Sequence, residues 1–258
     1  MIKASIDIGT NSTRLLVTEM YPDKKIIPIT YLERITKLGS GLDENNPLGD
    51  EAMQRVISAL LEFMPIMASH QVEQTHLIAT SATRDAVNRE AFLNKIRSKT
   101  DLDCRVLSGE DEARLSFLGA ISDTRPEGEF LVCDIGGGST EFIFGENERI
   151  LHSESIDIGS RRLTRSLLVN DPPRESEIRG LYDFVRERID DRFDGVQISR
   201  VLVAGGTAST LALIDANMPI NHAERAHLYT LDERRLQAII ERLRLKSVEE
   251  RRRIRGLH

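Results

Sequence analysis

A short acidic segment that contains glycine occurs twice in the sequence. The first copy is Asp7-Ile8-Gly9-Thr10-Asn11-Ser12-Thr13, and the second is Asp134-Ile135-Gly136-Gly137-Gly138-Ser139-Thr140. Each copy lies between two apolar runs, which predicts a strand, a turn and a second strand in each half of the chain. Glycine lets the backbone approach an anion closely, and free N–H groups together with Ser and Thr hydroxyls bind phosphate. The matched pair therefore predicts two phosphate-binding turns, whereas either copy alone would also suit an ordinary β-hairpin.

Two carboxylates accompany the second turn. Asp134 ends one predicted strand and Glu141 begins the next. Because Asp is uncommon within strands, a carboxylate that closes an apolar strand calls for an explanation. Hard oxygen ligands beside a glycine turn suit Mg²⁺ bound to a phosphate, so the pair is a candidate metal site.

Two further segments could bind an anion. Arg84 ends the run Thr80-Ser81-Ala82-Thr83-Arg84, in which small hydroxyl side chains accompany a guanidinium suited to bidentate phosphate contact. An ordinary surface ion pair of Arg84 with Asp85 or Glu90 is the alternative. Gly205-Gly206-Thr207 follows an apolar run and opens a predicted helix, whose N-terminus would present free N–H groups.

Three consecutive acids lie between the two turns, in Ser108-Gly109-Glu110-Asp111-Glu112-Ala113-Arg114. Ser108 followed by Asp111 forms a capping pattern, and acids in a first helical turn are favoured by the helix dipole. Capping needs only one or two carboxylates, so a third could act as the general base for a water molecule. The spacing alone does not say which of the three this is.

The glycine turns do not match the commonest nucleotide motifs. Gly136, Gly138 and Glu141 place a carboxylate where the third glycine of a dinucleotide fingerprint would pack against a helix. The following Phe142-Ile143-Phe144 continues as a strand, and no Gly-Lys-Ser/Thr sequence of a P-loop occurs. Glycine turns, a carboxylate pair, an arginine and a candidate base together indicate phosphoryl chemistry.

The composition is that of an ordinary soluble globular protein, with 258 residues, 40% of them hydrophobic and 29% charged. A net charge of −6 argues against nucleic-acid binding, although residues 234–258, with nine Arg or Lys and three Glu, could attract a polyanion or form a solvated helix face.

Cys104 and Cys133 are predicted to be small core residues, and the six His show no zinc-ligand spacing. No membrane-length apolar run or signal-peptide pattern occurs, so we expect a cytoplasmic protein with no membrane or nucleic-acid partner, and leave a homodimer open.

The hydrophobic pattern predicts two similar halves with a boundary in the segment 123–129. Strands are predicted at 2–8, 13–20, 26–36, 76–80, 104–107, 130–134, 139–145, 150–157 and 200–204. Helices are predicted at 50–69, 88–98, 109–122, 208–213, 232–244 and 247–255, with others between 157 and 200. Pro65 should kink the first helix because it removes an N–H donor. The repeated order suggests a duplicated α/β fold with a cleft between two lobes, where ligands usually bind.

In this order and spacing, the motifs resemble the exopolyphosphatase/guanosine pentaphosphate phosphohydrolase family, within the actin-like, sugar-kinase-like (ribonuclease H-like) ATPase superfamily. The resemblance runs from Asp7 to Leu257 and includes Leu38-Gly39-Ser40-Gly41-Leu42 and Arg253-Ile254-Arg255-Gly256-Leu257. It implies two lobes with a central cleft. Residues 1–124 would form the lobe with the first turn and the catalytic Glu, and residues 125–258 the lobe with the second turn.

The resemblance also implies roles for individual residues. Glu112, in Glu-Ala-Arg, corresponds to the family's catalytic base, and Asp134 and Glu141 correspond to the carboxylates associated with Mg²⁺. The phosphate-binding residues would be Asn11, Ser12, Arg84, Gly136, Gly137, Gly138, Ser139, Gly206 and Thr207.

We therefore expect a Mg²⁺-dependent phosphohydrolase that removes the terminal phosphate of inorganic polyphosphate or of guanosine pentaphosphate. The sequence does not separate these substrates, because both end in the same phosphoanhydride. Glu112 argues against a sugar- or acetate-kinase-like transferase, and a polyphosphate- or nucleotide-binding regulator without turnover is a third hypothesis. Family members continue past Arg-Gly-Leu through an apolar helix and a last strand, so we expect this chain to lack the C-terminal end of the fold.

Overall fold

The computed structural model describes residues 1–23, 25–41, 47–124, 126–189, 198, 200–219 and 225–257. The chain forms two compact units, Met1–Glu112 and Ala113–His258. The cleft expected between the two lobes stays a prediction. Within the described residues, no helix combines the length and the apolar character that a membrane crossing would need.

Unit 1 is built on a five-stranded mixed sheet in the order β3-β2-β1-β4-β5. The central strand β1 is antiparallel to β2 and parallel to β4. Alternating burial along β1 and β2, with Ile6, Ile8 and Leu15 fully buried, follows from the period of two in a strand. The strands are β1 (Ile2–Ile8), β2 (Thr13–Met20), β3 (Ile26–Arg34), β4 (Gln74–Ala79) and β5 (Cys104–Val106).

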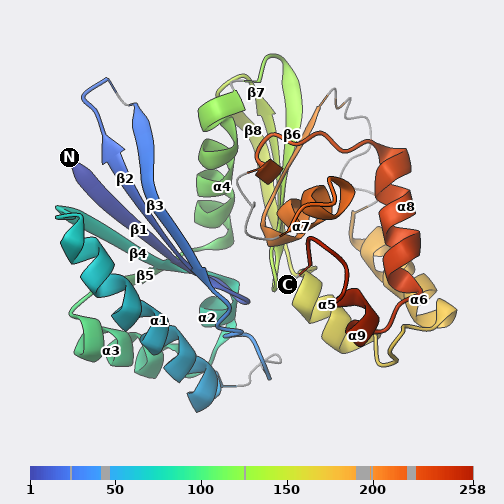
Figure 1. Ribbon diagram of the computed structural model, residues 1–258, viewed down its shortest axis with the longest axis horizontal. Helices are drawn as coiled ribbons and strands as arrows, with labels where there is room; N and C mark the ends of the chain where they lie inside the picture. The colour runs from blue at the N-terminus through green and yellow to red at the C-terminus, as the bar shows by residue number, and fades with distance from the viewer. Residues whose placement is uncertain are drawn as a thin grey trace. The chain divides into compact units, whose positions relative to one another are not determined.

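Two long helices of unit 1, α1 (Asp50–Ser69) and α3 (Arg89–Thr100), lie side by side on one face of this sheet (Figure 1). The predicted apolar face of α1 is buried in the core of the unit, from Ala52 to Met67. A short helix that the sequence analysis did not predict, α2 (Ser81–Asp85), follows β4. Helix α1 runs to Ser69 with Pro65 inside it, where the ring lies on the exposed side.

The helix α4 (Gly109–Thr124) begins in unit 1, and its residues from Ala113 onward belong to unit 2. Its buried residues Ala113, Phe117 and Ile121 form a core cluster with residues of β6 and β7 (Figure 1). The Phe117 and Phe130 rings are stacked, with centroids 5.6 Å apart. The compact units therefore divide within α4, whereas the division predicted between residues 124 and 125 falls at its end.

Unit 2 repeats the strand plan of unit 1 with one strand fewer among its described residues, in the order β8-β7-β6-β9. Here β6 is antiparallel to β7 and parallel to β9, as β1 is to β2 and β4. The strands are β6 (Glu129–Ile135), β7 (Thr140–Glu146), β8 (Arg149–Ile156) and β9 (Val201–Ala204).

The remaining helices of unit 2 include two between β8 and β9 and three after β9. An apolar cluster of Ile214, Ile239 and Ile254 joins α7, α8 and the turn that follows α9. The last helix is shorter than predicted, because the chain turns after Arg251 and buries Ile254 in this cluster. The helices are α5 (Ser160–Leu167), α6 (Glu175–Ile189), α7 (Gly206–Asp215), α8 (Glu233–Arg244) and α9 (Val248–Arg251).

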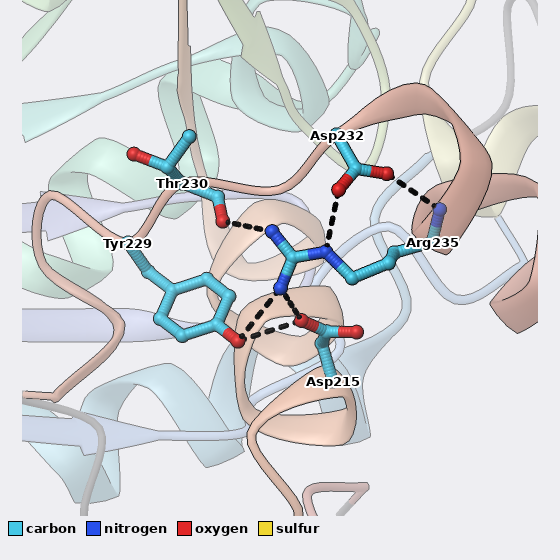
Figure 2. A network of polar contacts seen from close by, with 5 residues as sticks. All are labelled: Asp215, Tyr229, Thr230, Asp232 and Arg235. Atoms are coloured by element: carbon cyan, nitrogen blue, oxygen red, sulfur yellow. Dashed lines mark hydrogen bonds and ion pairs between the residues drawn. The ribbon is translucent and has the colours of Figure 1, made fainter.

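A polar network fixes the end of α7 to the start of α8 (Figure 2). The Arg235 guanidinium donates to the carboxylates of Asp215, at 2.6 Å, and Asp232, at 2.8 Å, and to the Thr230 carbonyl, at 2.7 Å. The Tyr229 hydroxyl donates to Asp215 at 2.6 Å, and Asp232 also caps α8 by accepting from the Arg235 amide. A planar guanidinium with several donors is suited to joining two carboxylates and a carbonyl in this way.

The common topology of the two sheets confirms the predicted fold class. Each unit has a central strand that is antiparallel to the next strand in sequence and parallel to a later one. The chain has a duplicated α/β fold.

Candidate functional site

The first repeated turn joins β1 to β2 and is closed by the Gly9 amide, which donates to the Ser12 carbonyl at 2.9 Å. Ser12 is buried and Asn11 is partly exposed. The segment after β3 holds the turn from outside, since the Lys37 amide donates to the Asn11 carbonyl at 2.8 Å and the Gly39 amide to the Thr10 carbonyl at 2.9 Å. Backbone hydrogen bonds therefore fix the shape of the turn.

The segment that carries Arg84 begins next to this turn, because β1 and β4 are parallel neighbours that end at the same edge of the sheet. Ile8 pairs with Ala79, and the Thr80 amide donates to the Ile8 carbonyl at 3.2 Å. The helix α2 then carries Arg84, whose Nη1 donates to the Leu107 carbonyl at 3.1 Å and to Glu112 Oε2 at 2.9 Å. The predicted phosphate-binding arginine and the predicted base thus form a half-buried ion pair, rather than the surface pair of Arg84 with Asp85 or Glu90.

The structure distinguishes the three acids at the start of α4. Ser108 caps the helix, as predicted, by accepting from the Asp111 amide at 3.1 Å. Asp111 pairs with Arg105 at 2.6 Å on the surface, and Glu110 is exposed. The Glu112 side chain is only 16% exposed and contacts Arg84. Of the three carboxylates, Glu112 is therefore the one held within a positively charged, partly dehydrated environment.

The second repeated turn joins β6 to β7, and the Gly136 amide donates to the Ser139 carbonyl at 3.0 Å, as in the first turn. The carbonyls of the turn accept from the start of α5: the Ser160 amide donates to Gly136, and the Arg161 amide to Gly137, each at 2.9 Å. Among the described residues, the amides of Gly137, Gly138 and Ser139 find no acceptor. Successive free amides form a cradle for an anion.

Asp134 and Glu141 lie directly opposite each other on β6 and β7, so their side chains are on the same face of the sheet. Ser116 of α4 donates to Asp134 Oδ2 at 2.6 Å, and Ser155 of β8 donates to Glu141 Oε1 at 2.7 Å. Glu141 is almost fully buried, with 1% of its surface exposed. Like charges opposite each other in a sheet are unfavourable unless a cation or proton compensates them.

The predicted anion-binding segment Gly205-Gly206-Thr207 also lies close to Asp134 of the carboxylate pair. Gly205 has φ +93 and precedes α7, and a Cβ there would lie 2.7 Å from the Ile135 carbonyl and 3.0 Å from Asp134 Oδ1. Only glycine fits this close approach, which directs the free first turn of α7, with Gly206 and Thr207, toward the ends of β6 and β9. Unit 2 thus brings together the carboxylate pair, the glycine turn and a helix N-terminus.

Several residues at these sites were not identified from the sequence. Ser116 and Ser155 orient the two carboxylates, and Arg162 Nε donates to the Gly138 carbonyl at 2.9 Å. Arg14, which pairs with Asp7 of the first turn, was also missed. Ser116 follows Glu112 by one helical turn, and Arg14 occupies the position in the first repeat that Glu141 occupies in the second, so alignment of the two repeats would have found Arg14.

Comparison with known proteins relates the chain to phosphatases. The model of the Ppx/GppA phosphatase family matches residues 16–258. Exopolyphosphatase 2 of Mycobacterium tuberculosis is 34% identical over 252 residues, which cover 93% of this chain and 79% of that protein. A bifunctional 3-dehydroquinate synthase/phosphatase of Fusobacterium nucleatum is 34% identical over 248 residues, which cover 91% of this chain but only 37% of that longer protein.

A solved structure shares the fold over the whole chain. The crystal structure of an exopolyphosphatase from Cytophaga hutchinsonii has a TM-score of 0.89 and 28% sequence identity, covering 100% of this chain and 84% of the other. The family match spans nearly the entire sequence and includes all the predicted site residues except Asn11 and Ser12. The chain belongs to the Ppx/GppA phosphatase family.

Proposed function

We propose that this protein is a Mg²⁺-dependent phosphohydrolase that removes the terminal phosphate of inorganic polyphosphate. The observation that carries the proposal is the second turn, where three amides without an acceptor among the described residues lie next to a carboxylate pair. Similarity to an exopolyphosphatase over 93% of the chain supports the substrate. Guanosine pentaphosphate is the alternative substrate, since it ends in the same phosphoanhydride.

The carboxylate pair fits Mg²⁺ by its chemistry. Mg²⁺ usually binds through one or two carboxylates together with water and substrate phosphates, rather than in a cage made only of protein ligands. Asp134 and Glu141 would hold the ion, with Ser116 and Ser155 orienting them as hydrogen-bond donors. When bound, Mg²⁺ would neutralise charge on the phosphate oxygens.

In the proposed mechanism, Glu112 accepts a proton from the water molecule that attacks the terminal phosphorus, while the bridging P–O bond of the anhydride breaks and the shortened polyphosphate leaves with the bridging oxygen. Arg84, whose Nη1 donates to Glu112 Oε2 at 2.9 Å, would hold this carboxylate in a fixed orientation. The amides of Gly137, Gly138 and Ser139 and the start of α7 donate hydrogen bonds to the phosphate oxygens as charge spreads over them. Asn11 and Ser12 would bind phosphate at the first turn.

The test is phosphate release from polyphosphate and, separately, from guanosine pentaphosphate, each with and without Mg²⁺. A general base typically contributes a factor of about 10² to 10⁴, so Glu112→Gln should lower kcat by that factor while substrate binding is retained. The matched control is Glu110→Gln, the same change on the exposed carboxylate two residues earlier, which should keep the wild-type rate.

Equal rates for wild type and Glu112→Gln would contradict the assigned base. A rate that does not depend on Mg²⁺ after chelation would contradict the metal requirement. A wild-type protein that binds polyphosphate but releases no phosphate would instead be a polyphosphate-binding regulator.

A further inference from the structure

The two repeated turns have the same backbone but different charges. In each, the amide of the first glycine donates to the carbonyl of a serine three residues later, from Gly9 to Ser12 at 2.9 Å and from Gly136 to Ser139 at 3.0 Å. Each turn follows a strand-ending aspartate, Asp7 or Asp134. The residue opposite this aspartate on the next strand is Arg14 in unit 1 and Glu141 in unit 2.

The third strand of each sheet continues the difference. Glu33 lies opposite Arg14, whereas Ser155 lies opposite Glu141. Along one row of the sheet, unit 1 therefore has a carboxylate, a guanidinium and a carboxylate, and unit 2 has two carboxylates and a hydroxyl. The first row contains its own cation, and the second has none.

Arg14 is held between its two carboxylate neighbours. Its Nη1 lies 3.5 Å from Asp7 Oδ2, and its Nε lies 3.0 Å from Glu33 Oε1. All three side chains are partly buried, with 28–34% of their surface exposed. Burial alone would lower the pKa of Arg14, but Asp7 and Glu33 raise it above its usual value. The two carboxylates therefore favour the charged form of the guanidinium.

We infer that Arg14 takes at the first turn the place that a divalent cation takes at the second, and so confines metal binding to unit 2. A cation that approached Asp7 would meet a fixed positive charge beside it, which repels the ion. Arg14 is thus a specificity residue for metal binding. The inference rests on the proposed Mg²⁺ role of Asp134 and Glu141.

The experiment converts the first row into a copy of the second. The double variant Arg14→Glu/Glu33→Ser gives unit 1 the acid, acid and hydroxyl set of unit 2. Its matched control, Arg14→Lys/Glu33→Ser, carries the same second change but keeps the positive charge. The measurement is Mn²⁺ binding to the chelated full chain by isothermal titration calorimetry, with circular dichroism to establish that each variant is folded.

We expect one Mn²⁺ per chain for the wild type and the control, and two for the double variant. If the double variant folds and binds no more Mn²⁺ than the control, the inference is wrong. A wild type that binds no Mn²⁺ would count only against the metal role of Asp134 and Glu141. The number of Mn²⁺ ions bound by the double variant, compared with the control, would still test the role of Arg14.

A milder variant covers the case in which the double variant does not fold. Arg14→Gln removes the guanidinium and leaves Asp7 and Glu33 in place, so it should gain a second, weaker Mn²⁺ site. Unchanged stoichiometry and affinity in Arg14→Gln would then overturn the inference.

Discussion

At the scale of single residues, the two cysteines have thiols that burial makes unreactive. Burial raises the pKa of Cys104 to about 12, and burial together with Asp134 and Glu141 raises the pKa of Cys133 to about 12. Since the thiolate is the reactive form, at pH 8 both thiols should react with iodoacetamide about a thousandfold more slowly in the native chain than in urea. Mass spectrometry of the labelled protein measures this, and rapid native labelling of Cys133 would contradict its placement in β6.

The same pKa values predict how these thiols affect stability. Because the folded pKa lies above the unfolded value, their contribution is fully present below about pH 9 and is lost as the pH rises toward 12. A Cys104→Ala/Cys133→Ala variant should therefore lose less stability than the wild type over this alkaline range, as measured by urea unfolding.

Sequence reasoning identified residue types better than residue partners. Asp134 and Glu141 could be singled out because both flank a glycine turn, and strand register then places them opposite each other. The partner of Arg84 could not be found in this way, because Glu112 lies 28 residues later in the sequence and the two side chains meet only in the folded chain. Ser108 was correctly predicted as a cap, since capping is a local interaction.

At the scale of elements, Glu177 organises the connection between α5 and α6. Its carboxylate accepts hydrogen bonds from the Arg174, Val169 and Asn170 amides at 2.7, 2.8 and 3.1 Å. The Arg174 amide and the Asn170 side chain, followed by the other amides, lower the pKa of Glu177 to about 2. A carboxylate whose pKa is lowered by folding stabilises the folded state above its unfolded pKa and loses that effect as the pH falls.

We therefore expect Glu177→Gln to lower the urea midpoint at pH 7, with the difference from wild type shrinking as the pH falls from about 4.5 toward 2. Urea titrations at several pH values test this. The control is Glu187→Gln, later in the same helix. A difference between Glu177→Gln and wild type that does not change with pH would show that charge is not the cause.

The elements themselves were largely predictable because strands and amphipathic helices have distinct periods. The first three strands and α1 have nearly the predicted bounds. Two helices were not predicted correctly from the sequence. Helix α2 has too few residues to show a period, and α9 ends before residue 255 because Ile254 packs against α7 and α8. Helix α1 continues through Pro65, with its buried face extending to Met67, and the kink expected at Pro65 stays a prediction.

At the scale of the whole molecule, duplication followed by divergence explains the distribution of chemistry. The sheet topology and the turn hydrogen bond are retained in both units, whereas the charges opposite the turn aspartates differ. The retained features are those that the backbone requires. The altered ones are side chains at the turn, which can change without loss of the fold.

Metal binding should therefore affect the stability of the two units differently. A ligand that binds only the folded state stabilises it by about 2.7 kcal/mol at a hundredfold excess over its Kd, which raises Tm by about 5–10 °C in a chain of this size. Because Asp134 and Glu141 both belong to unit 2, adding Mg²⁺ to the chelated protein should raise the Tm of the transition in which unit 2 unfolds. Calorimetry of wild type and Glu141→Gln, each with and without Mg²⁺, measures this shift, which the variant should lose. Glu148→Gln, on the exposed turn between β7 and β8, should keep it. The same shift in wild type and Glu141→Gln would place the stabilising ion elsewhere and remove the support for a metal at the second turn.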